Sequence, residues 1–70
     1  MDERVRDKHD DEYEMLVNVL HAQIHIRNAE GWVKADPYLS GRLADAKSAL
    51  QRIVDDCSEE NQRLASLAVV

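Results

Sequence analysis

Two histidines four positions apart, His21 and His25, have the residue type and spacing best suited to chemistry in this chain. On a helix, side chains at this spacing project in the same direction and could bind one metal ion. Glu14 and Asn18 share that helical face, but they lie two turns and one turn before His21, respectively. The residues between the histidines lack the glutamate of the HExxH zinc motif. We therefore predict a polar strip that binds neither a metal nor another cofactor.

A single cysteine, Cys57, is the other side chain that could act as a nucleophile. It falls among apolar residues at helical spacing, where a cysteine behaves as a small hydrophobic side chain. No Cys/His pair, G-x-S-x-G turn or glycine-rich phosphate loop appears in a context that would activate a nucleophile. The sequence therefore predicts a protein that is not an enzyme.

The same features predict the compartment. One cysteine cannot form a disulfide within the chain, which favours a reducing environment. The first fourteen residues are charged throughout, unlike a signal peptide. No apolar run approaches the roughly 18–20 residues of a membrane span. We expect a cytoplasmic protein that does not interact with membranes.

The charge pattern indicates which partners are suitable. The formal net charge is −5, and clustered Lys and Arg, which nucleic-acid binding requires, are missing. Four acids near the N-terminus recur at intervals of four, three and four residues: Glu3, Asp7, Asp10 and Glu14. On a helix they form one acidic stripe. The stripe either binds a basic partner or is simply solvated near a helix N-terminus, where negative charge is favourable.

Glycine and proline are rare, and they mark the ends of two helices. Gly31 follows a long periodic segment and can end a helix in the left-handed conformation. Asp36 followed by Pro37 is typical of a helix start, with Asp as the cap and Pro in the first helical position. The sequence predicts an all-α fold in one domain, residues 1–70. Its elements are a helix at about 3–30, a turn at 31–36 and a helix at about 37–68, paired as an antiparallel hairpin.

The second predicted helix carries one apolar seam at alternating intervals of four and three residues, as in a coiled-coil-like bundle. Its positions are Leu39, Leu43, Ala46, Leu50, Ile53, Cys57, Glu60, Leu64 and Leu67, of which only Glu60 is not apolar. Asp56 and Glu59 have the spacing of a capping box, which allows a kink near 56–58. Because the seam stays in phase through this segment, one continuous helix is favoured.

The first predicted helix has two apolar faces that point in roughly opposite directions. One comprises Tyr13, Leu16, Val17, Leu20 and Ile24, and the other comprises Met15, Val19, Ala22, Ile26 and Ala29. One face can pack on the second helix of the same chain. Because no third element long enough to cover the other face is expected, we predict that the Met15–Ala29 face forms a homodimer resembling a four-helix bundle. The alternative is a monomer whose C-terminus folds back.

Two of the three aromatic residues, Trp32 and Tyr38, fall at the predicted turn. They either close the end of the bundle or, with Val33, form a binding tip, since Trp and Tyr are enriched at binding centres. We include Trp32, Val33 and Tyr38 with the acidic stripe among the predicted partner-binding residues.

A short acidic helical hairpin that dimerises resembles the small phage-encoded proteins that inhibit host regulators, such as quorum-sensing anti-activators. The hairpin, with a turn such as "KADPYL" before its second helix, also resembles small helical chaperones of type III secretion. The first resemblance implies a protein that inhibits a partner with a basic surface, such as the DNA-binding domain of a transcription regulator. The second implies a co-chaperone that shields an apolar client.

Overall fold

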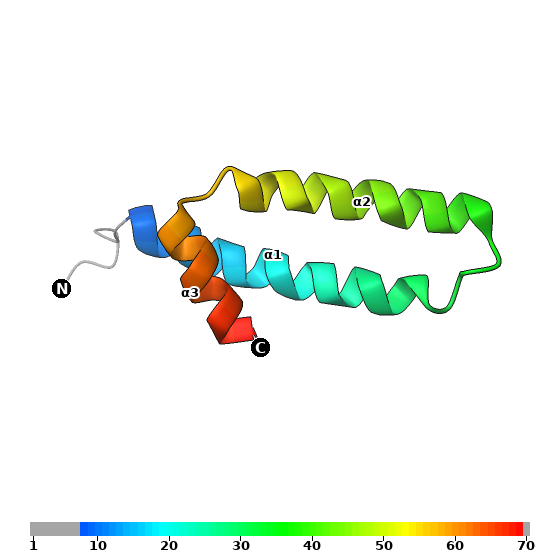
Figure 1. Ribbon diagram of the computed structural model, residues 1–70, viewed down its shortest axis with the longest axis horizontal. Helices are drawn as coiled ribbons and strands as arrows, with labels where there is room; N and C mark the ends of the chain where they lie inside the picture. Colours follow the sequence, from blue (N-terminus) through cyan, green and yellow to red (C-terminus); the bar gives the residue numbers. More distant parts are fainter. Residues whose placement is uncertain (1–7, 70) are drawn as a thin grey trace.

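The computed structural model describes residues 8–69 as three helices and no strand (Figure 1). They are α1 (Lys8–Glu30), α2 (Pro37–Asp55) and α3 (Glu59–Val69). Helices α1 and α2 run antiparallel, and α3 turns back to lie across the first half of α1 (Figure 1). The all-α prediction is confirmed. The predicted start of the first helix, residues 3–7, lies outside the described residues.

The turn between α1 and α2 begins without a left-handed residue. Gly31 donates its backbone N–H to the Asn28 carbonyl, and Trp32 donates to Ala29, so α1 ends in tightened i to i−3 bonds. No residue between 8 and 69 has a positive φ, so the predicted left-handed conformation at Gly31 is wrong. A Cβ atom at Gly31 would lie 3.3 Å from the Asn28 carbonyl oxygen, and this close approach favours glycine there.

Helix α2 starts where the sequence places it. The Asp36 carboxylate accepts the backbone N–H of Leu39 at 3.1 Å, and Pro37 occupies the first helical position. The Ser40 hydroxyl donates to the Val33 carbonyl at 2.8 Å, which fastens the turn to the first turn of α2. Asp36 and Pro37 were sufficient to predict the start of α2 because a cap and a first-turn proline act within four residues.

The predicted continuous second helix is divided in two. Helix α2 ends at Asp55, and α3 begins at Glu59 after a three-residue break. Ser58, rather than Asp56, caps α3: its carbonyl accepts the Gln62 N–H at 2.9 Å and its hydroxyl accepts the Asn61 N–H at 3.3 Å. The two-helix hairpin is therefore corrected to three helices, with the break in the segment where the sequence allowed a kink.

A carboxylate from α1 holds this break in place. One Glu12 oxygen accepts the backbone N–H of Ser58 at 3.0 Å, the Ser58 hydroxyl at 2.9 Å and the Asn61 side-chain amide at 3.0 Å. Asn61 is only 1% exposed. We call these three bonds the Glu12 clasp. Because buried polar groups are costly when unpaired, the clasp favours the bent arrangement of α2 and α3.

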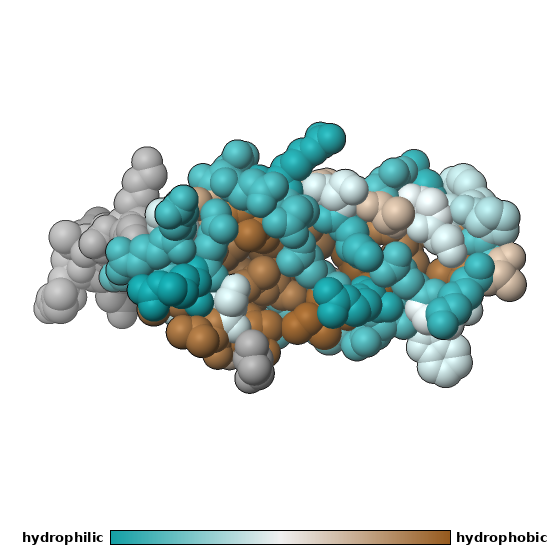
Figure 2. Space-filling model, viewed as in Figure 1, coloured by the Kyte–Doolittle hydropathy of each residue, from teal (hydrophilic) through white to brown (hydrophobic). Residues whose placement is uncertain are grey.

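The core is small and lies where the three helices meet. Leu16, Val54 and Ala65 are the buried apolar residues, one from each helix. The partly buried side chains of Tyr13, Val17, Val19, Leu20 and Cys57 pack around them. Figure 2 shows apolar side chains gathered where α3 crosses α1.

The bend changes the predicted seam of the second helix. Val54 is buried in place of Ile53, which is partly exposed. Leu64 and Leu67 leave the seam and are exposed on α3, while Asn61 and Ala65 face α1 instead. The in-phase seam was misleading beyond Cys57 because α3 changes direction after Ser58.

Removing the Glu12 clasp should release α3 before the rest of the fold. We expect Glu12→Ala to lower the free energy of unfolding by about 2 kcal/mol, because three hydrogen bonds to a charged group are lost, including that of the buried Asn61 amide. Urea denaturation measures the loss, and hydrogen exchange should show the largest gain in the amides of α3. Glu14→Ala, an exposed carboxylate on the same helix, is the control. Equal effects of the two substitutions would contradict the clasp.

Candidate protein-binding surfaces

The hairpin tip exposes both of its aromatic rings. Trp32 is 90% exposed and Tyr38 is 71% exposed, so neither ring closes the end of the bundle. Trp32 stands at the edge of a groove of about 360 Å³ between the end of α1 and the start of α2. The lining comprises Ala29, Trp32, Val33, Leu39, Arg42 and Leu43. Arg42 is the one charged residue in an otherwise apolar lining.

The acidic stripe is only partly within the described chain. Asp10 and Glu14 are exposed on the first turns of α1, whereas Glu3 and Asp7 lie outside the described residues. From Glu14 to Glu30, α1 rises by roughly 24 Å, at 1.5 Å per residue. The tip and the stripe are therefore separate surfaces on one chain.

The Met15–Ala29 face of α1, which the sequence predicts as the dimer contact, is largely uncovered by α3. The residues that line two pockets show which side of the hairpin each α1 side chain faces. The pocket between α1 and α3 is lined by Leu20, Ile24 and Arg27, together with Gln23, Ser66 and Val69. At 100° per residue, Arg27 and Ala29 project about 160° apart. Met15, Ala22 and Ala29 thus project to the side of the hairpin opposite α3, and Met15 is 39% exposed, whereas Val19 packs against the core.

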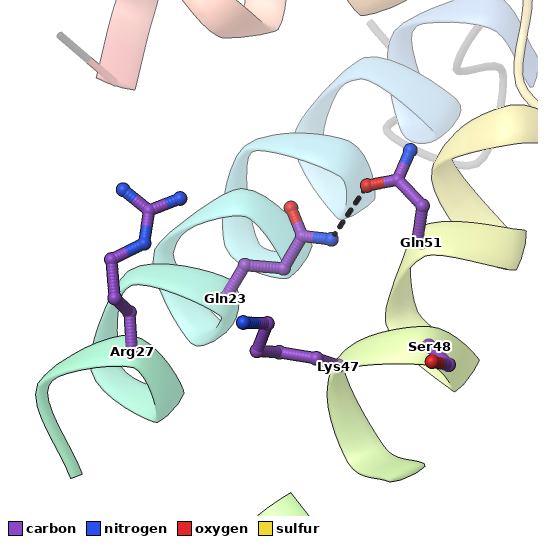
Figure 3. Close-up of a pocket in the computed structure, with 5 residues that line it drawn as sticks. All are labelled: Gln23, Arg27, Lys47, Ser48 and Gln51. Carbon is purple, nitrogen blue, oxygen red and sulfur yellow. Dashed lines mark hydrogen bonds between the residues drawn. The ribbon is translucent and has the colours of Figure 1, made fainter. Parts of the chain in front are cut away.

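A polar pocket of about 260 Å³ lies between α1 and α2 on the side that carries α3 (Figure 3). Its lining is Gln23, Arg27, Lys47, Ser48 and Gln51. Gln23 donates its side-chain amide to Gln51 at 3.2 Å, and Lys47 pairs with Glu30 at 3.1 Å. These groups join the two helices, so we assign the pocket to helix pairing. Sequence reasoning missed it because Gln23 and Gln51 carry no motif.

His21 and His25 are both exposed on α1. Among the residues that the structure describes, no group of three or more His, Cys, Asp or Glu side chains is arranged to hold a metal ion. The side chain of Asn18, which shares this face, donates instead to the Glu14 backbone carbonyl at 2.9 Å.

The thiol of Cys57 lies beside the core at the end of α2. It donates to the Ile53 carbonyl at 3.2 Å. Desolvation by the surrounding residues raises the pKa of the thiol, and the negative charges of Glu12 and Asp56 raise it further. A raised pKa leaves little thiolate at neutral pH, and the thiolate is the reactive form. This environment does not activate a nucleophile.

No helix in residues 8–69 combines the length and the apolar character needed to cross a membrane.

No protein-family model, curated protein or solved structure matches this chain.

The exposed histidines give a direct test of the metal prediction. We expect equimolar zinc to leave the melting temperature unchanged, because two exposed imidazoles without a third ligand make a poor site. A site of micromolar affinity would instead add roughly 2.7 kcal/mol at a hundredfold excess of free ion over its Kd. Thermal denaturation followed by circular dichroism measures this. A zinc-dependent rise that His25→Ala abolishes would contradict the prediction.

Proposed function

We propose that this protein is a non-enzymatic binding module that inhibits or sequesters another protein through the hairpin tip. The observation that carries the proposal is the 90% exposed Trp32 beside an apolar groove. Leaving a tryptophan in water forgoes the hydrophobic free energy of its burial, which a partner can recover. Trp also contributes strongly at the centres of protein interfaces.

The electrostatic part of the proposal concerns the partner's surface. Asp10 and Glu14 are exposed at the start of α1, and the sequence continues the stripe to Glu3 and Asp7. Such a surface suits a protein with clustered basic residues, such as the DNA-binding domain of a transcription regulator. The row of carboxylates would then bind the basic surface with which the regulator otherwise contacts the phosphates of DNA. The module would release the regulator from DNA without binding DNA itself.

The protein acts as a homodimer in this proposal. The Met15–Ala29 face of α1 is the predicted contact, and the exposure of Met15 supports that assignment. The second candidate function, a secretion co-chaperone, would use this same exposed apolar face for a client. The oligomeric state separates the two. A dimeric inhibitor is stable alone at twice 8.0 kDa, whereas a co-chaperone without its client is monomeric and prone to aggregate.

Identification of the partner comes first. The full chain is immobilised and exposed to a lysate of its native cell, and retained proteins are identified by mass spectrometry against a Trp32→Ala column. The protein that depends on Trp32 is then purified. If it is a transcription regulator, addition of the module should displace it from its DNA in a mobility-shift assay. A purified partner whose activity the module leaves unchanged would contradict inhibition.

With the purified partner, Trp32→Ala should weaken binding by about 2 kcal/mol or more, roughly thirtyfold in Kd, because a large ring at a binding centre is removed. This loss should depend little on salt. Leu67→Ala is the matched control, since Leu67 is also well exposed but lies on α3.

Asp10→Ala combined with Glu14→Ala should weaken binding at low salt only, because exposed charges are screened as salt rises. Calorimetry or biosensor titration measures each Kd. Unchanged binding by folded Trp32→Ala would end the tip assignment.

A further inference from the structure

The hairpin face opposite α3 carries exposed residues from both α1 and α2. On α2, Gln51 lines the polar pocket on the α3 side, and Arg42 lines the apolar groove. These two positions project 180° apart on a helix. Leu39, Ala46 and Ile53 project toward the same side as Arg42, next to Met15 and Ala22 on α1. Leu39 is 44% exposed and Ile53 is 40% exposed. We call this surface the dimer face.

Three further residues on this face form a row whose charges are complementary to those of the same row reversed. Arg42, Ala49 and Asp56 are spaced seven apart and are all exposed. Asp56 keeps helical backbone angles, so the row continues to the end of α2. The row runs from positive through neutral to negative with a small residue at its centre.

We propose that a second copy of this chain covers the dimer face with its helices antiparallel, so that α2 lies over α2 about a twofold axis near Ala49. In this arrangement Arg42 of each copy lies over Asp56 of the other, which gives two symmetric ion pairs. The pairs cannot form within one copy, because fourteen residues of helix separate Arg42 and Asp56 by roughly 21 Å. This inference specifies the dimer of the proposed function.

The opposite twofold arrangement, with both tips at one end, is less favourable. It would place the acidic first turns of both α1 helices together, including Asp10, Asp11 and Glu14. Like charges side by side oppose association. The antiparallel arrangement separates these ends and brings the tip of each copy toward the start of α1 in the other. Trp32 of one copy and Asp10 of the other can then contribute to one partner site.

The size of the face is sufficient for a dimer. Helix α1 has 23 residues and is about 35 Å long, and two packed helices are about 20 Å wide. The flat area is roughly 700 Å², close to the ~800 Å² that each protein contributes to a standard interface. Because side chains make the surface uneven, its accessible area is larger than this flat projected area. The face that carries α3 is largely hydrophilic beyond that helix (Figure 2), so it offers no comparable surface.

Charge reversal tests the pairing. We expect sedimentation equilibrium to give a dimer for the wild-type chain, and Arg42→Glu to weaken dimerisation roughly tenfold, because two attractive pairs become repulsive. Asp56→Arg should do the same. The double variant Arg42→Glu/Asp56→Arg should restore the wild-type dissociation constant to within about threefold. Arg63→Glu, on the outer side of α3, is the control and should have no effect.

A wild-type monomer at 100 micromolar concentration, or a double variant no better than the single variants, would overturn the inference. If a reversal reduces helicity, cysteine cross-linking decides instead. In a Cys57→Ser background, Ala49→Cys should form an interchain disulfide on mild oxidation, because the two positions meet at the axis. Ala44→Cys, an exposed position on the other flank of α2, should not. Equal cross-linking at both positions would contradict the arrangement. Neither experiment involves the protein partner, so dimerisation and partner binding can fail separately.

Discussion

The hydrogen bonds of the Glu12 carboxylate to Ser58 and Asn61 determine the architecture of this chain. They satisfy the free N-terminus of α3 with a group from α1 and bury the Asn61 amide in the same contact. As a consequence α3 lies across α1 and places Ala65 against Leu16. Without the clasp, the in-phase seam of the second half would favour a straight helix, and the Leu16–Leu20 side of α1 would be exposed to water.

Helix α1 is central because it has apolar side chains on two sides. Helix α3 covers one side of its first half, α2 lies beside it, and the Met15–Ala29 face stays partly exposed, most of all at Met15. Three apolar residues are buried in the part of the chain that the structure describes, which is a small core. In our proposal a second copy enlarges that core, while Trp32 and the acidic start of α1 remain for another protein. The dimer face adjoins the tip, since Leu39 and Arg42 also line the groove beside Trp32.

Local signals in the sequence predicted the local structure. Asp36 and Pro37 act within one turn, and they correctly placed the start of α2. The break at 56–58 depends on Glu12, which is 46 residues away from Ser58, so periodicity alone favoured the wrong continuous helix. The two apolar faces of α1 were recognised, but the cover of the Tyr13–Ile24 face was assigned to a continuous second helix because α3 was not expected. The sequence placed Trp32 and Tyr38 at the turn, but it did not show whether they are buried or exposed, because exposure depends on the geometry of the turn.

We propose that α1 uses one apolar side within the chain and the other between copies. Isotope-filtered nuclear Overhauser measurements on an equal mixture of labelled and unlabelled chains separate the two kinds of contact. We expect contacts between copies at the methyl groups of Met15, Ala22 and Ala49. The methyl groups of Leu16 and Leu20 should contact only α2 and α3 of their own chain. Contacts between copies at Leu16, or none at Ala22 and Ala49, would contradict it.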